Sequence, residues 1–266
     1  MNNLLLIDGH SIMNRAFYGI PMLTNHEGIH TNAIYGFINI MLRAMEDEKS
    51  DHIAVAFDLK APTFRHKMYE MYKGTRKPMP AELHEQVPVI KEILASMNIP
   101  VITLEGYEAD DILGTVGKKA QSLGYNVVIL SGDRDLLQLA DEHIKIRLPK
   151  TIKGRTEIEN YYPEDVMEKY MATPSEFIDL KALMGDSSDN IPGVPGIGEK
   201  TAMSIISKYH SIENAYEHVE ELTPAKAKNS LRENYDLAKL SKVLATIETD
   251  APVEFNIEDS AIGNIF

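Results

Sequence analysis

Four short apolar runs, rich in β-branched residues, constrain the fold of this chain more than any other feature. They occupy residues 4–7, 53–57, 101–104 and 127–130. Each run is continuously apolar instead of alternating, which is typical of strands buried on both faces of a parallel sheet. The sequence therefore predicts a central sheet whose middle strands are shielded from water.

Helical patterns separate these runs. They cover residues 33–46, 87–97 and 110–123, and Asn98 or Gly124 marks the passage into the next strand. This β-α alternation predicts an α/β fold with a mostly parallel central sheet flanked by helices. A fifth strand is expected at residues 144–148.

The second half of the chain has a different character, because strand signals end near residue 160. Thr173, Pro174 and Glu176 form a helix-start pattern, with Thr as the cap and Pro at the first position. Helical patterns then continue to about residue 247. We expect an α/β core at 1–172, a helical subdomain at 173–255, and a tail or the start of a linker at 256–266.

Composition places the chain among ordinary globular proteins. Of its 266 residues 44% are hydrophobic and 25% charged, and it has no cysteine, which excludes disulfides and thiolate metal sites. No apolar run approaches the ~18 residues of a membrane span, and no secretory pattern opens the chain. These features predict a cytoplasmic protein without membrane contact. The net charge of −13 argues against a generic nucleic-acid binder, so the placement of the acids matters.

Acidic residues follow the predicted strands at the ends where an open parallel sheet binds ligands. A further pair lies in the helical half with a three-residue spacing that can place both on one side of a turn. The set is Asp8, Asp58, Glu108, Asp110, Asp111, Asp133, Asp135, Asp186 and Asp189. Any one of them alone could be a helix cap or a turn residue. Caps do not require every strand to end in an acid, so the whole set favours one shared site.

Such a cluster requires positive charge. Two carboxylates about 4 Å apart repel by ~4 kcal/mol at an effective dielectric near 20. Oxygen ligands without Cys or His favour Mg²⁺ or Mn²⁺ over zinc. Two or more such ions could clamp a phosphodiester and activate water for in-line hydrolysis. The sequence lacks a Walker loop, which argues against nucleoside-triphosphate chemistry.

Residues 60–77 supply cations and aromatic rings for a phosphate substrate. The basic residues are Lys60, Arg65, Lys67, Lys73, Arg76 and Lys77, interleaved with Phe64, Tyr69 and Tyr72. This pattern suits single-stranded nucleic acid through phosphate contacts and base stacking. The alternative is a solvated loop with ordinary core aromatics. A new helix is expected after Pro78 and Pro80.

A glycine-rich turn precedes another expected helix. Its glycines are Gly193, Gly196 and Gly198, and Lys200 and Thr201 follow. Exposed amides at a helix start attract phosphate, so this turn is a candidate contact for the DNA backbone. The alternative is a tight turn between packed helices.

In this order, the motifs resemble one known family. They are Ile7-Asp8-Gly9, Val55-Ala56-Phe57-Asp58, Gly106-Tyr107-Glu108-Ala109-Asp110-Asp111, Gly132-Asp133-Arg134-Asp135, Gly185-Asp186-Ser187-Ser188-Asp189-Asn190 and Gly193-Val194-Pro195-Gly196-Ile197-Gly198. Together they resemble the flap endonuclease / 5′–3′ exonuclease family, and most closely the N-terminal 5′ nuclease domain of bacterial DNA polymerase I. The resemblance extends to about residue 255.

The resemblance implies a PIN-like 5′ nuclease core, a helical arch at about 60–90 and a helix-turn-helix element around 193–198 that grips duplex DNA and can hold K⁺. It implies that the nine acids form the metal site and that Lys73 and Arg76 contact the scissile phosphate. It also implies that Arg15, Tyr18, Arg65 and Tyr72 line the DNA path. His10 stands where many relatives have Asn, a departure expected to be minor.

The implied function is hydrolysis at 5′ flaps and 5′ ends of DNA, as in primer or flap removal during replication and repair. The implied setting is a monomer at the bacterial nucleoid, with a covalently linked polymerase domain in the full-length protein or as a stand-alone nuclease. A PIN-like ribonuclease, a haloacid-dehalogenase-type phosphohydrolase and a non-catalytic DNA-structure binder are the alternatives. The second requires two Asp residues two apart after the first strand, whereas Gly9 and His10 follow Asp8 here.

Overall fold

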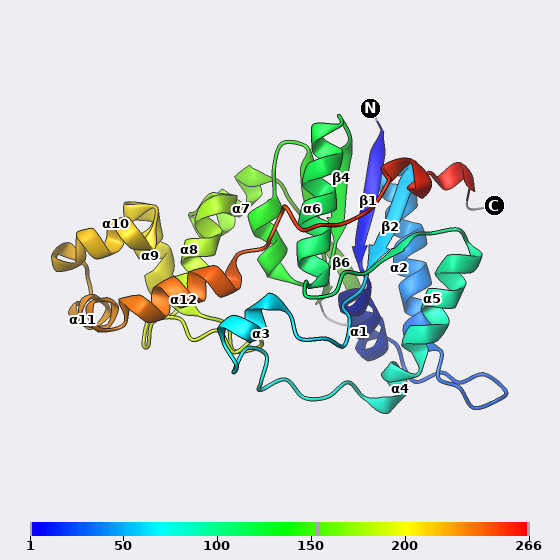
Figure 1. Ribbon diagram of the computed structural model, residues 1–266, viewed down its shortest axis with the longest axis horizontal. Helices are drawn as coiled ribbons and strands as arrows, with labels where there is room; N and C mark the ends of the chain where they lie inside the picture. Colours follow the sequence, from blue (N-terminus) through cyan, green and yellow to red (C-terminus); the bar gives the residue numbers. More distant parts are fainter. Residues whose placement is uncertain (1, 153–154, 265–266) are drawn as a thin grey trace.

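The computed structural model describes residues 2–152 and 155–264 and contains one six-stranded sheet (Figure 1). The strands are β1 (Asn3–Asp8), β2 (His52–Ala56), β3 (Val101–Ile102), β4 (Asn126–Leu130), β5 (Ile144–Ile152) and β6 (Arg155–Tyr161), in the order β3-β2-β1-β4-β5-β6. β1 to β5 are parallel and β6 pairs with β5 antiparallel. The mostly parallel sheet is confirmed, whereas β3 is shorter than predicted and the charged edge strand β6 was not predicted.

Alternate residues of the central strands enter two different cores, which explains their continuous apolar sequence. Leu5 and Ile7 pack with the face covered by α1 (Gly9–Gly19), α2 (Asn32–Glu48) and α5 (Gln86–Ser96). Leu4 and Leu6 pack on the other face, against α6 (Ala109–Ser122). Helices therefore cover both faces of the sheet, as Figure 1 shows.

The second half is helical beyond β6. Its helices are α7 (Pro163–Tyr170), α8 (Pro174–Met184), α9 (Glu199–Tyr209), α10 (Ile212–Glu217), α11 (Ala225–Glu233) and α12 (Tyr235–Ala245). The predicted start of α8 is confirmed, since the Thr173 hydroxyl accepts from the Glu176 amide at 3.3 Å. None of the helices in the described residues combines the length and apolar composition needed to cross a bilayer.

The predicted arch segment is helical over two short stretches, α3 (Phe64–Met68) and α4 (Ala81–His84). The chain between them consists of turns and extended backbone. In Figure 1 it runs from α3, beside α12, to α4, below α1. The segment therefore crosses the edge of the sheet at which the acidic motifs lie.

The C-terminal segment runs back along α6 to the far end of β2 (Figure 1). The Thr115 hydroxyl accepts from the Ala251 amide at 3.1 Å, and the Ile262 amide donates to the Asp51 carbonyl at 2.8 Å. Two short 3-10 helices, η3 (Ile257–Ser260) and η4 (Ile262–Asn264), lie in the part for which a tail or linker is expected. Through residue 264 this part is docked on the core.

Candidate active site

Four acidic side chains lie at the carboxyl edge of the sheet, and we call them the rim carboxylates. Asp8 ends β1, Asp58 follows β2, Asp133 follows β4, and Asp110 lies in the first turn of α6. β1 lies between β2 and β4, so β2 and β3 extend the sheet on one side of β1 and β4 to β6 extend it on the other. Open α/β sheets bind ligands at such a point.

Local hydrogen bonds hold these acids in place. Asp8 accepts from the Ser11 amide at 3.0 Å as the cap of α1, and from the Ser131 hydroxyl at 2.7 Å. Asp58 accepts from the Ala109 amide at 2.8 Å, at the start of α6. The helix-cap interpretation is therefore correct for Asp8, whereas the cap of α6 is Glu108 and Asp58 bonds to that helix start from a distant part of the chain. In both acids the bond to the helix start uses a single carboxylate oxygen.

The rim is short of positive charge. Burial, and then repulsion from Asp58, raise the pKa of Asp8 to about 6. Burial, and then the charges of Asp133 and Asp8, raise the pKa of Asp110 well above its usual range. A cation bound between these carboxyl groups would stabilise their charged forms.

His10 belongs to this rim, a position that the sequence gave no reason to expect. Its Nδ1 lies 3.4 Å from Asp58 Oδ2, and its ring meets the Phe57 ring edge-on at 5.1 Å. Burial alone would raise the pKa of Asp58, but His10 and the Ala109 amide lower it to about 2. The departure at residue 10 therefore affects a site carboxylate directly.

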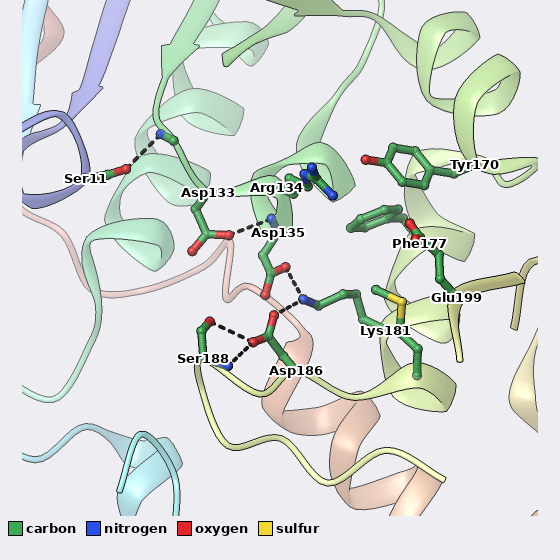
Figure 2. A pocket seen from close by; sticks show the side chains of 12 residues that line it. Ser11, Asp133, Arg134, Asp135, Tyr170, Phe177, Lys181, Asp186, Ser188 and Glu199 are labelled. Carbon is green, nitrogen blue, oxygen red and sulfur yellow. Dashed lines mark hydrogen bonds and ion pairs between the residues drawn. The ribbon is translucent and has the colours of Figure 1, made fainter. Parts of the chain in front are cut away.

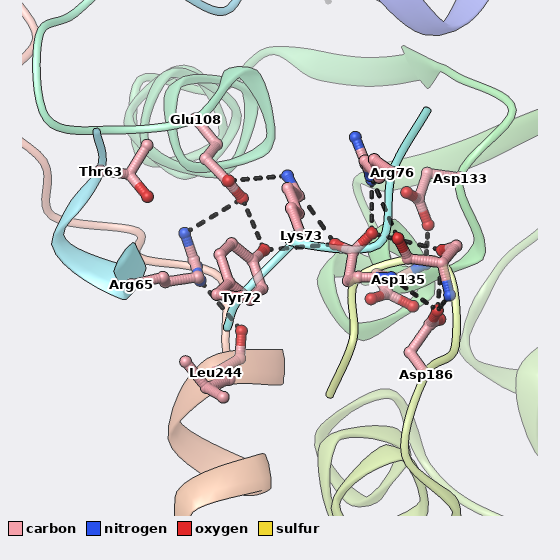
Figure 3. Close-up of polar contacts among 12 residues, drawn as sticks. Thr63, Arg65, Tyr72, Lys73, Arg76, Glu108, Asp133, Asp135, Asp186 and Leu244 are labelled. Atoms are coloured by element: carbon pink, nitrogen blue, oxygen red, sulfur yellow. Dashed lines mark hydrogen bonds and ion pairs between the residues drawn. The ribbon is translucent and has the colours of Figure 1, made fainter. Parts of the chain in front are cut away.

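Residues 72–76, which we call the base of the arch, face the rim and pair with other acids (Figure 3). Lys73 Nζ lies 2.6 Å from Glu108 Oε1 and 3.7 Å from Asp189 Oδ2, and Arg76 also forms an ion pair with Asp189. The Tyr72 hydroxyl donates to Glu108 at 3.0 Å and to Asp189 at 3.2 Å. Tyr72 is only 3% exposed, so the predicted stacking of DNA on its ring is wrong for this conformation.

Backbone contacts reinforce this pairing. Lys73 has a left-handed backbone, with φ +54°, and its amide donates to the Asp189 carbonyl at 2.8 Å. The Asn190 side chain donates to the Met71 carbonyl at 2.6 Å. A non-glycine residue at positive φ is sterically disfavoured and persists only where its surroundings hold it. These contacts join the base of the arch to the loop of Asp186 and Asp189.

Arg65 and Asp111 are buried partners, which corrects two predictions. Asp111 is fully buried, and its two oxygens accept from Arg65 Nη1 and Nη2 at 2.8 Å each. Arg65 is 2% exposed and also donates to the carbonyls of Leu244 and Thr246. With its donors used inside the protein, Arg65 does not line a DNA path, and Asp111 does not face the rim.

Lys181 on α8 is a site residue that the sequence analysis missed. It is 4% exposed, and its Nζ lies 2.7 Å from Asp135 Oδ1 and forms an ion pair with Asp186. Burial, and then Asp133, raise the pKa of Asp135 to about 7, whereas the Lys181 contact, working against burial, lowers that of Asp186 to about 2. The available signal was a lysine in the apolar run from Leu180 to Met184 of this helix.

A cleft of about 690 Å³ joins the rim to the base of the arch. Its lining includes Asp8, Asp58, Glu108, Asp110 and Asp133 from the core, Lys73, Arg76 and Lys77 from the arch segment, and Tyr18 from α1. Tyr18 is 72% exposed, so its ring is available to a ligand. Arg15 is half-buried on the same helix and lies outside this lining.

The donor set of the rim fits a hard divalent cation, because it consists of carboxylates whose own charges are poorly compensated. Within residues 2–152 and 155–264, however, no three His, Asp or Glu side chains are grouped so that they could hold a metal ion. Mg²⁺ commonly binds through one or two carboxylates and keeps several waters. An ion at this rim would accordingly be held partly through water.

The glycine-rich turn divides into a buried and an exposed part. Gly193 is buried, its amide donates to the Ser241 hydroxyl at 2.9 Å, and a Cβ there would meet the Gly185 backbone at 2.4 Å. Gly193 therefore shapes the turn, and its predicted DNA contact is wrong. Gly196, Gly198 and Lys200 are exposed at the start of α9, and Thr201 is half-buried.

Family models match almost the whole chain. Residues 3–171 match "5′-3′ exonuclease, N-terminal resolvase-like domain", and residues 172–265 match "5′-3′ exonuclease, C-terminal SAM fold". DNA polymerase I of Bacillus subtilis is 50% identical over 254 residues, and that of Bacillus caldotenax is 49% identical over 258 residues. These alignments cover 96% and 97% of this chain but 29% of each relative, so the chain spans under a third of their length.

Solved structures share the fold. The T5 5′-exonuclease with bound zinc has a TM-score of 0.75 at 24% identity, covering 93% of this chain and 90% of that one. The catalytic core of Rad2 in complex with DNA has a TM-score of 0.60 at 16% identity, covering 96% of this chain and 81% of that one. Since the two family models together match residues 3–265, this chain belongs to the 5′–3′ exonuclease family.

Proposed function

We propose that this chain is a structure-specific 5′ nuclease that hydrolyses phosphodiesters at 5′ flaps and 5′ ends of DNA. The observation that carries the proposal is the cleft in which the rim carboxylates face Lys73 and Arg76 across a space of about 690 Å³. One wall is rich in negative charge and suits metal ions, and the other carries cations that suit a phosphate. Phosphodiester hydrolysis requires both.

Lys73 and Arg76 are proposed to bind and orient the scissile phosphate. In this structure both cations are engaged by Glu108 and Asp189, so an entering phosphate competes with those carboxylates. The Lys73 amide, in a left-handed stretch of backbone, donates to the Asp189 carbonyl. This bond fixes the backbone from which the Lys73 and Arg76 side chains extend. Tyr18, an exposed residue of the cleft lining, is proposed to contact the strand that enters.

Asp8, Asp58, Asp110 and Asp133 are proposed to hold two or more Mg²⁺ or Mn²⁺ ions, partly through water, with Glu108, Asp135, Asp186 and Asp189 around them. Bound divalent ions would supply an activated water and neutralise charge on the leaving oxygen. The bonds of Asp8 and Asp58 to helix starts keep both groups oriented toward the rim. Gly196, Gly198, Lys200 and Thr201 are proposed to contact the duplex backbone, with K⁺ at this turn as part of the same proposal.

The biological setting is part of the proposal. The relatives that are about 50% identical to this chain are bacterial DNA polymerases I, and the alignments cover 29% of their length. This supports a 5′ nuclease unit linked to a polymerase domain. Removal of primers or flaps in replication and repair would follow. Action as a monomer at the bacterial nucleoid stays a prediction.

The decisive experiment is cleavage of a labelled 5′-flap DNA with Mg²⁺, with EDTA, and by Asp133→Asn. Asp236→Asn is the matched control, because the Asp236 side chain is 96% exposed on α12, in the helical half. Cutting at the flap junction by the native chain and the control, lost with EDTA and in Asp133→Asn, is the expected result. Tight binding without cutting would identify a non-catalytic binder, and cutting restricted to an RNA flap would identify a PIN-like ribonuclease.

A further inference from the structure

A second cleft, of about 430 Å³, lies beside the rim on the side away from the arch. Its lining runs from Asp133 and Arg134, after β4, past Tyr170 and Phe177 to Glu199 at the start of α9 (Figure 2). One end therefore borders the candidate active site, and the other borders the exposed end of the glycine-rich turn.

Arg134 is the cation of this cleft. The side chain is exposed, and within the described parts of the chain it has no hydrogen bond or ion pair. Lys73, Arg76 and Lys181, which also lie near the acids, are ion-paired. Lys181 already compensates Asp135 and Asp186, so the guanidinium of Arg134 is available to a ligand.

Tyr170 is the second polar group that lacks a partner. It is 3% exposed, and its hydroxyl is buried with no hydrogen bond in the described structure. The ring is held edge-on against Phe177 at a centroid distance of 5.0 Å. In Figure 2 the hydroxyl and the guanidinium of Arg134 point toward each other across the cleft. A buried hydroxyl without a partner is unfavourable, so a ligand with acceptor oxygens would complete it.

We propose that this cleft binds a backbone phosphodiester of duplex DNA, through the Arg134 guanidinium and the Tyr170 hydroxyl. The inference rests on the proposed function, in which the rim cuts one strand while Gly196 and Gly198 grip the duplex. A duplex that reaches both passes over the cleft, because the lining residue Glu199 directly follows that turn. A planar guanidinium pairs well with phosphate oxygens.

The test is the salt dependence of binding to a 5′-flap DNA in EDTA, followed by fluorescence anisotropy. Loss of one phosphate contact lowers the slope of log K against log[salt] by about 0.9. Arg134→Ala is therefore expected to lower the slope by that amount and to weaken binding about tenfold at low salt. Arg134→Lys should keep the slope. Tyr170→Phe should weaken binding about threefold at every salt concentration without changing the slope.

Arg43→Ala is the matched control, since it removes the same charge from an exposed position on α2 whose ion pair with Asp47 is 3.9 Å long. Plain duplex and a 5′-phosphorylated single strand are the comparison ligands. The expected result is a loss in Arg134→Ala on flap and duplex DNA, none on the single strand and none in Arg43→Ala. Equal slopes in Arg134→Ala and the native chain, or the same loss on the single strand, would overturn the inference.

These readings separate the inference from the function on which it rests. Binding is measured without divalent metal, whereas the proposed function is tested by Mg²⁺-dependent cleavage. A native chain that cuts flaps while Arg134→Ala keeps the native slope overturns the duplex subsite alone. A native chain that binds flaps without cutting overturns the nuclease proposal, while a reduced slope in Arg134→Ala would still support the subsite.

Discussion

Two sets of carboxylates at the same edge of the sheet differ in how their charge is compensated. Glu108, Asp111 and Asp189 are paired with Arg65, Lys73 and Arg76 at short distances. Asp8, Asp110 and Asp133 have no ion pair with a protein cation among the described residues, and Asp58 has only His10. Burial and mutual repulsion raise the pKa of Asp8 and Asp110. The paired set stabilises the fold. The rim set repels itself, and a bound cation can offset this repulsion.

Removal of a paired acid should have the largest effect on stability. Asp111→Ala leaves the buried Arg65 guanidinium without its carboxylate, and loss of one partner of a buried pair typically costs about 3–5 kcal/mol. We expect a fall of that size in the free energy of unfolding, measured by urea denaturation. Asp236→Ala, at a fully exposed position, should change little. The double variant Arg65→Met/Asp111→Leu should recover most of the loss, and no recovery would contradict the assignment of Asp111 as a structural partner.

Removal of a rim acid should reduce activity without reducing stability. Asp110→Asn is expected to reduce Mg²⁺-dependent cleavage by about ten- to a hundredfold, since loss of an outer-shell partner of a metal typically costs that much in metal affinity or activity. Its melting temperature should stay the same or rise, because a charge repelled by Asp133 and Asp8 is removed. Cleavage and thermal melting are measured on the same preparations, with Asp236→Asn as the control. A variant with native activity and lower stability would place Asp110 in the paired set.

Divalent metal should stabilise the native chain more than a variant that lacks a rim acid. A ligand that binds only the folded state at a hundred times its Kd stabilises by about 2.7 kcal/mol. We expect Mg²⁺ to raise the melting temperature of the native chain accordingly, and to raise that of Asp110→Asn much less. Calorimetry with and without EDTA measures both. Equal gains in the two proteins would show that the stabilising ion binds outside the rim.

The smallest expected effect concerns Tyr72, whose hydroxyl joins Glu108 and Asp189. Tyr72→Phe keeps the ring but leaves two buried carboxylates with one donor fewer, which should cost about 1.5 kcal/mol in the free energy of unfolding. Tyr35→Phe is the control, since Tyr35 is 58% exposed. Denaturation measures the loss, and an unchanged free energy of unfolding in Tyr72→Phe would show that water replaces the hydroxyl.

Much of the site could be predicted because its signals are local. Continuous apolar runs mark buried parallel strands, and the carboxyl ends of such strands share one edge, which brings Asp8, Asp58 and Asp133 together. The helix-start pattern at Thr173 is equally local and is confirmed. β6 was missed because its residues, Arg155 to Tyr161, are mostly polar on an edge strand where burial imposes no apolar run.

Other site features depend on contacts that no motif records. Asp110 and Asp111 are adjacent in one motif, but successive helix residues point about 100° apart, so only the packing of α6 sends one to the rim and the other to Arg65. Gly193 and Gly196 lie in one turn, yet the Gly185 backbone and Ser241 cover only the first. Lys181 reaches Asp135 only because α8 packs against the 3-10 helix at Arg134–Leu139, which follows β4.

By itself, the sequence determined the type of sheet, the edge at which the acids gather and the chemistry that oxygen ligands favour. Apolar runs, caps and strand ends act over a few residues, so these features can be read along the chain. The tertiary structure alone decided which acids are compensated. Arg65 joins Asp111, 46 residues away, and the Leu244 carbonyl, 179 residues away. Charge pairing and burial depend on such distant neighbours, which come together only when the chain folds.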